Sequence, residues 1–148
     1  MKAEKQVILL LVALLVGLVL SGCGGDSEQK EQTEKARVTT TKVVLRMLHS
    51  AITQFKMDTG RLPTEEEGLM ALIEPQSDVE NYQLGGYLDA TDVPKDGWGR
   101  EFVYRILYED RPVVIFSYGA DGKEGGDGYD ADLSTAPTVQ AGIVEMVR

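Results

Sequence analysis

Residues 38–60 read VTTTKVVLRMLHSAITQFKMDTG, and this stretch decides the fold. Proline and glycine are absent from residues 28–59, and Gly60 is a natural C-terminal stop. The sequence predicts one long helix over residues 28–59, on which His49 is a surface or packing residue. Apolar side chains recur at the three- and four-residue spacing of one helix face: Val38, Val44, Leu45, Leu48, Ala51, Ile52 and Phe55.

A second, shorter helix is predicted to follow the long one. Thr64 and Glu67 have the spacing of a capping box, in which each side chain bonds the other residue's backbone amide. Glu65 and Glu66 would face the positive end of the helix dipole, which accounts for the glutamates without a binding site. Pro75 would end this helix, and three residues would form its apolar face: Leu69, Leu72 and Ile73.

Two strands are predicted after a loop-rich stretch over residues 76–100, in which Trp98 is expected to anchor the core. Residues 113–118 form a nearly continuous run of strand-forming residues, and residues 109–112 have the length of a hairpin turn. Residues 101–108 alternate, with one face made of Phe102, Tyr104, Ile106 and Tyr108. The predicted fold class is α+β, with one long N-terminal helix, one short helix and a small antiparallel β-sheet.

The composition excludes several classes of protein. The chain has 148 residues, with 24 Asp+Glu against 15 Lys+Arg and a formal charge of −9. Such a balance argues against nucleic acid as a partner, because phosphates require a basic surface. A single cysteine and a single histidine cannot form a disulfide framework or a structural zinc site. Enzymes that depend on histidine are disfavoured for the same reason.

The N-terminal 22 residues are predicted to be a bacterial lipoprotein signal peptide. Lys2 and Lys5 precede 14 apolar residues, Val7–Leu20, a run too short for the roughly 20 that a spanning helix needs. Leu20-Ser21-Gly22-Cys23 closely resembles a lipobox, which implies lipidation of Cys23 after cleavage. An ordinary secretory signal with a buried cysteine, or a short membrane anchor, are the alternatives. Gly24 in place of an aspartate favours the outer over the inner membrane, with the chain facing the periplasm.

An acidic, glycine-rich stretch follows the second predicted strand. Residues 119–132 hold five carboxylates, five glycines and one lysine. Calcium binds six to eight oxygens from carboxylates and carbonyls, and glycines let a backbone turn its carbonyls toward an ion. The spacing does not match the EF-hand template. Composition alone leaves two interpretations open, a calcium-binding loop and a solvated acidic loop.

Three motifs in order resemble the head of GspG-type major pseudopilins of type II secretion systems. They are residues 55–72, FKMDTGRLPTEEEGLMAL; residues 86–88 with 93–99, GYL and VPKDGWG; and residues 115–122, IFSYGADG. The resemblance implies a long helix on an antiparallel sheet, and a structural calcium ion in the loop after the last strand. It also implies a structural subunit and not an enzyme, with secretion-system or envelope proteins, or further copies of the chain, as partners.

Carried over residue by residue, the resemblance gives a set of calcium ligands. The carboxylates would be Asp121, Asp130 and Asp132, with backbone oxygens from around Tyr118 and Lys123. Because loop spacing varies in the family, Asp127 is a substitute candidate for Asp130 or Asp132.

The chain also departs from the family pattern. Pseudopilins carry a glutamate inside the apolar N-terminal helix that is thought to register subunits, but Val7–Leu20 contains no acidic residue. Gly97 stands in place of the usual proline, and the tail is unlike the family. The predicted organisation is a signal peptide (1–22), a tether and exposed helix start (23–35), a pseudopilin-like domain (36–134) and a tail (135–148). A secretion-system subunit and a lipid-tethered binding module on the same scaffold are the two functional hypotheses.

Overall fold

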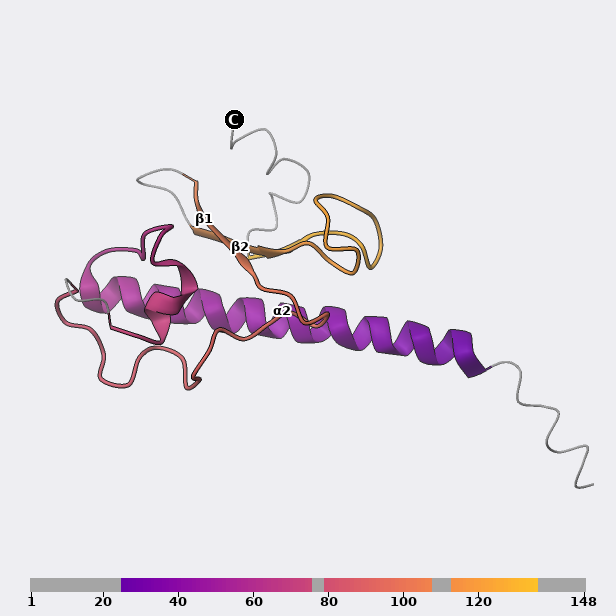
Figure 1. Ribbon diagram of the computed structural model, residues 1–148, viewed down its shortest axis with the longest axis horizontal. Coiled ribbons are helices and arrows are strands. Elements are labelled where there is room, and N and C mark those ends of the chain that lie inside the picture. The colour runs from indigo at the N-terminus through magenta and orange to yellow at the C-terminus, as the bar shows by residue number, and fades with distance from the viewer. Residues whose placement is uncertain (1–24, 76–78, 108–112, 136–148) are drawn as a thin grey trace, which may run out of the picture. The chain divides into compact units, whose positions relative to one another are not determined.

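The computed structural model describes residues 25–75, 79–107 and 113–135 (Figure 1). The predicted signal peptide, Cys23, the turn over residues 109–112 and tail residues 136–148 lie outside these ranges. Among the described residues, no helix has the length and apolar character to cross a membrane. The chain divides into two compact units, residues 1–33 and 34–148. In the first, residues 27–33 are helical and exposed.

Helix α2 spans Gly25–Thr59, so the predicted long helix is confirmed and begins slightly earlier than expected. The Gly60 amide donates to the carbonyl of Lys56 (2.9 Å), and its left-handed φ of +77° ends the helix. His49 is exposed, as predicted. The buried side chains follow the predicted spacing and are Leu45, Leu48, Ala51, Ile52 and Phe55.

The second predicted helix is a 3-10 helix, η1, over Gly68–Leu72. The capping box is confirmed, because Thr64 N donates to Glu67 Oε2 (2.6 Å) and Glu67 N donates to Thr64 Oγ1 (3.2 Å). The helix begins at Gly68, however, and not directly after Thr64, since Gly68 has φ +57°. A left-handed residue cannot continue an α-helix, so the box closes a turn that leads into η1.

The sheet has three antiparallel strands in the order β1-β2-β3: Val103–Ile106, Val113–Ser117 and Leu133–Ser134. Val103 pairs with Phe116, which pairs in turn with Ser134. Phe102 and Tyr104 are buried and Arg105 is exposed, as the alternation predicts; Tyr108 lies outside the described residues. Strand β2 is buried at every residue, in agreement with its continuous apolar run.

Helix α2 and the sheet share one hydrophobic core. Leu48 and Phe55 of α2, Leu72 of η1 and Ile115 of β2 are fully buried within it. The ring of Phe55 packs edge-on against Tyr82 and Tyr87, at 6.2 and 5.3 Å between centroids. Trp98 is partly buried against the core and anchors the loop, as predicted.

An ion pair fixes the chain between α2 and η1. The Arg61 guanidinium donates to both carboxylate oxygens of Glu67, each at 2.7 Å. The hydrogen bond from Arg61 lowers the pKa of Glu67 from 4.5 to about 2, against the opposing effect of burial; bonds from Thr64 add to the lowering. The depressed pKa means that folding favours the ionised carboxylate.

We predict that Glu67→Gln destabilises the domain by about 1–2 kcal/mol at pH 7, after allowing for solvent screening at Arg61. Since the pKa of Glu67 is lowered by folding, its contribution is complete above pH 4.5 and is lost as the pH falls toward 2. Urea unfolding of wild type and variant between pH 3 and 7 should show the difference shrinking with acid. Glu66→Gln, at an exposed neighbour, is the control; a pH-independent loss for Glu67→Gln would contradict the assignment.

Candidate functional site: the acidic loop and its anchor

The acidic loop, residues 118–132, joins β2 to β3. Its carboxylates are Asp121, Glu124, Asp127, Asp130 and Asp132. Gly119 and Gly126 have φ of +61° and +79°, and a Cβ on either would lie 2.6 Å from the carbonyl oxygen of Asp130. The backbone at Asp130 is thus packed between two glycines that no larger residue can replace without displacing it.

Backbone hydrogen bonds close the acidic loop on itself. Ala120 N donates to the Tyr129 carbonyl (2.9 Å), and Asp132 N donates to the Gly125 carbonyl (3.2 Å). The Tyr118 carbonyl, one of the predicted calcium ligands, accepts a bond from Gly122 N (3.2 Å). The loop is therefore a folded structure with its own ladder of bonds.

The predicted carboxylate ligands differ in their surroundings. Asp121 and Asp130 are exposed, whereas Asp132 is only 6% exposed. Asp121 Oδ1 accepts from Lys123 N, and Asp132 Oδ2 accepts from Gly125 N, both at 3.0 Å. Among the described residues, no three His, Cys, Asp or Glu side chains group closely enough to hold a metal ion. The calcium ligands therefore remain a prediction.

Burial raises the pKa of the Asp132 carboxyl, so the fold disfavours its charged form. The bond from Gly125 N opposes this effect, and the charges of Glu124 and Asp121 add to it. A cation beside Asp132 would remove the cost of holding that charge.

Arg100 anchors the base of the acidic loop. Its two terminal nitrogens donate to the carbonyls of Gly119 (2.6 Å) and Ala120 (2.7 Å). A Cβ at Gly122 would come within 2.7 Å of Nε of Arg100, so the guanidinium lies directly against the loop backbone. Charge-assisted bonds of this kind are stronger than neutral ones.

Asp96 positions Arg100 and the end of β2 together. This carboxylate is 5% exposed. Its Oδ1 accepts from the amides of Trp98 (2.9 Å) and Arg100 (2.8 Å), and its Oδ2 accepts from Ser117 Oγ (2.6 Å). Sequence reasoning noted Asp96 only as part of a loop. The available signal was an aspartate two residues before Trp98, the spacing of an Asx turn.

The loop over residues 96–100 touches helix α2 through Gly97. Gly97 N donates to Oγ1 of the fully buried Thr41 (2.9 Å), which itself donates to the Arg37 carbonyl (2.8 Å). A Cβ at Gly97 would lie 2.2 Å from that carbonyl, so only glycine allows this approach. Trp98 Nε1 donates to Glu34 Oε2 (2.9 Å), which gives the loop a second bond to the helix.

We predict that Arg100→Met loosens the acidic loop and costs about 1–3 kcal/mol, because two carbonyls lose a charged donor. Amide hydrogen exchange should speed up across residues 119–132, and urea unfolding should report the stability change. Arg105→Met is the matched control, since the exposed Arg105 bonds only the carbonyl of neighbouring Tyr104 (3.2 Å) in the described contacts. Equal loop protection in the two variants would show that Arg100 does not hold the loop.

Comparison with known proteins gives a consistent result. The family model described as type II secretion system (T2SS), protein G, matches residues 29–136. The type II secretion system core protein G of Vibrio cholerae serotype O1 is 33% identical over 132 residues, which cover 88% of this chain and 85% of that protein. The Pseudomonas aeruginosa core protein G is 29% identical, with 88% of each chain covered.

A solved structure extends this result to the fold. The crystal structure of the major pseudopilin from the type 2 secretion system of enterohaemorrhagic Escherichia coli has a TM-score of 0.57 at 29% identity. The match covers 71% of this chain and 87% of that chain. The long helix and small antiparallel sheet predicted from the resemblance are confirmed, and the chain belongs to the type II secretion system protein G family.

Proposed function

We propose that this chain is a non-enzymatic structural subunit of a type II secretion system and takes part in protein secretion across the outer membrane. The observation that carries this proposal is the extent of the family match, which runs from α2 through the acidic loop to β3. The relatives are core secretion proteins and a pseudopilin, none of which is named as an enzyme. A tethered binding module outside the system is disfavoured because these relatives are all secretion-system components.

The proposal includes a lipid anchor on Cys23. Its support is the sequence alone: a basic start, a short apolar run and a cysteine directly after Ser21 and Gly22. Several acyl chains would hold the chain stably at a membrane, since each buried methylene contributes about 0.8 kcal/mol. The anchor would place the head in the periplasm.

The proposal also includes a structural calcium site in the acidic loop. The donors fit this ion in kind, because the loop offers carboxylate and carbonyl oxygens and no nitrogen or sulfur ligand. The buried Asp132 would be the first ligand, with Asp121 and Asp130, or Asp127 in place of the latter, and the carbonyls of Tyr118 and Lys123. Bound calcium would neutralise the crowded carboxylates, while Arg100 holds the loop base.

Calcium should raise the melting temperature of the full chain in detergent, and a chelator should reverse the rise. Asp132→Asn should change the stability of the chain in opposite directions in chelator and in calcium. In chelator it should match or exceed wild type, since the pKa of Asp132 is raised and its charge is unfavourable; in calcium it should be about 1–3 kcal/mol less stable. Asp89→Asn, exposed and outside the loop, should respond like wild type. A wild type that ignores calcium would overturn the site.

Deleting the gene in its own bacterium should lower release of a type II substrate into the medium by about tenfold or more. The substrate should accumulate in the periplasm, because signal-peptide export is untouched, and the wild-type gene should restore release. Immunoblots of medium and periplasm provide the measurement. Unchanged release in the deletion strain would contradict the proposed function.

The same strain tests the anchor. With Cys23→Ala, metabolic labelling with palmitate should disappear from the chain and membrane retention should fall. A variant that keeps its acyl label would refute lipidation at Cys23, and it would leave the secretion result unaffected.

A further inference from the structure

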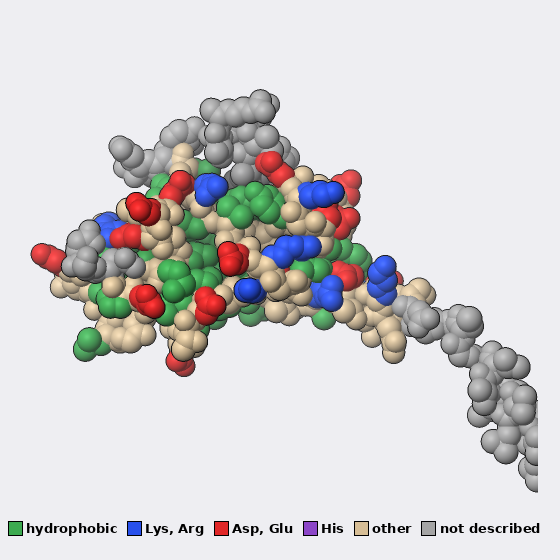
Figure 2. Space-filling view, in the orientation of Figure 1, with side chains coloured by type: hydrophobic (Ala, Val, Ile, Leu, Met, Phe, Trp, Pro, Cys, Tyr) green, Lys and Arg blue, Asp and Glu red, His purple; other side chains and the backbone are tan. Residues whose placement is uncertain are grey.

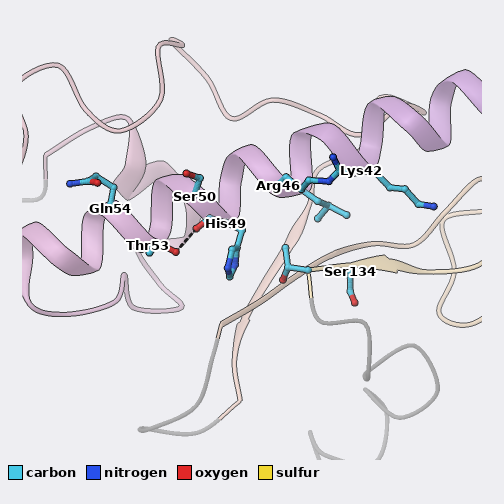
Figure 3. Close-up of a pocket in the computed structure, with 9 residues that line it drawn as sticks. Lys42, Arg46, His49, Ser50, Thr53, Gln54 and Ser134 are labelled. Atoms are coloured by element: carbon cyan, nitrogen blue, oxygen red, sulfur yellow. Dashed lines mark hydrogen bonds between the residues drawn. The ribbon is translucent and has the colours of Figure 1, made fainter.

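A groove runs beside helix α2, where the helix faces the end of β3 (Figure 3). It has a volume of about 570 Å³. Lys42, Arg46 and His49 line it from α2, and Ser134 and Thr135 line it from the sheet side. The buried Leu45 contributes an apolar surface to the groove.

The groove is basic in an acidic protein. Lys42, Arg46 and His49 follow one another at steps of four and three residues, so they lie on one face of the helix. The other described lining residues are Leu45, hydroxyl residues and Gln54, with no Asp or Glu among them. In a chain with a formal charge of −9, this grouping favours an acidic partner with an apolar contact.

A candidate partner surface is the loop over residues 80–89, here called the Leu84 loop. Leu84 is 100% exposed at its tip. The loop is nevertheless firmly anchored, because the amides of Tyr87 and Leu88 both donate to the Leu72 carbonyl, at 2.7 and 3.2 Å. Gly86 N donates to the Gln83 carbonyl (3.0 Å), which closes the turn that presents Leu84.

Close packing also fixes the foot of the Leu84 loop. A Cβ at Gly86 would lie 2.8 and 2.9 Å from the carbonyls of Ile73 and Leu72, so the chain rests directly on the end of η1. Tyr82 and Tyr87 pack on each other at 5.1 Å and on Phe55 of α2. An apolar tip on a fixed base binds with little loss of conformational entropy.

Carboxylates surround the Leu84 loop. Glu80 and Asp89 lie within it and are exposed. Asp58 and Glu74 interact electrostatically with the hydroxyls of Tyr87 and Tyr82, respectively. Arg61, whose guanidinium lies 5.8 Å from the centroid of the Phe55 ring, is paired with Glu67. On the face shown in Figure 2, acidic side chains likewise predominate at the end where α2 terminates.

We propose that the basic groove of one copy of this chain receives the Leu84 loop of a second copy. The inference rests on the proposed function, because it assigns the contact through which the heads of such subunits associate. Leu84 would pack on the apolar surface of the groove beside Leu45, and Glu80 and Asp89 would face Lys42 and Arg46. The proposed contact is heterologous: groove and loop share no residue, and each copy gives its loop to one neighbour and its groove to another, so that further copies can add.

Disulfide crosslinking in cell membranes tests this contact on the full chain. Gln83→Cys and Ser50→Cys put one thiol beside Leu84 and one in the groove without removing a proposed contact. A chain with both changes should give a ladder of oligomers under mild oxidation. The wild-type chain, whose only cysteine is Cys23, controls for disulfides at that residue. Pairing Gln83→Cys with Met57→Cys, exposed on α2 but outside the groove, controls for random collision.

Two further changes, each made in the chain that carries Gln83→Cys and Ser50→Cys, test whether the apolar and charged side chains make the contact. Leu84→Asp and Arg46→Glu should each lower the crosslinked fraction at least fivefold. Lys56→Glu makes the same charge reversal on α2 outside the groove and should leave the crosslinked fraction unchanged. Combining Arg46→Glu with Glu80→Lys and Asp89→Lys should restore most of the ladder, which a merely misfolded chain cannot do.

The outcomes separate this contact from the function on which it rests. A ladder that depends on Leu84 and Arg46 supports it. A single dimer band, no crosslink, or a ladder insensitive to both changes overturns it, even when the wild-type gene restores secretion. A ladder in cells whose secretion does not need the gene would support the contact and overturn the proposed function.

Discussion

The folded domain that begins at Glu34 depends on the hydrogen bonds made to the buried carboxylate of Asp96. It accepts three hydrogen bonds from donors in two segments: the amides of Trp98 and Arg100 and the hydroxyl of Ser117. The first two fold the loop over residues 96–100, and the third ties that loop to the end of β2. With Gly97 bound to Thr41, one short loop joins helix, sheet and acidic loop.

In the described contacts, the carboxylate of Asp96 and the guanidinium of Arg100 bond different groups. A buried carboxylate is tolerated when donors satisfy its lone pairs, and Asp96 receives neutral donors only in the described contacts. The Arg100 guanidinium is therefore directed to the carbonyls of Gly119 and Ala120. The cation of Arg100 is thus used on the backbone of the acidic loop in these contacts.

The spacing of residues in the sequence was sufficient to predict the elements whose residues interact locally. The α2 stripe, the Thr64–Glu67 capping box and the buried strand β2 each depend on spacings within a few residues. Non-local contacts were not predictable in this way. Strand β3 has two residues and exists only by pairing with β2. Asp96 accepts a hydrogen bond from Ser117, which lies 21 positions away in the sequence. The 3-10 form of η1 depends on the left-handed φ of Gly68, which its sequence context did not reveal.

Two of the departures from the family pattern differ in their consequences. Gly97 stands where the resemblance implies a proline and is accommodated locally, because its amide supplies a donor to Thr41 that proline lacks and its missing Cβ admits the Arg37 carbonyl. Val7–Leu20 lacks the acidic residue that the resemblance implies. Under the proposed lipid anchor on Cys23, the register of one subunit against the next would have to be set by contacts made by residues after the anchor. The proposed contact between the basic groove and the Leu84 loop would provide that register, because charge sets orientation while apolar burial gives affinity.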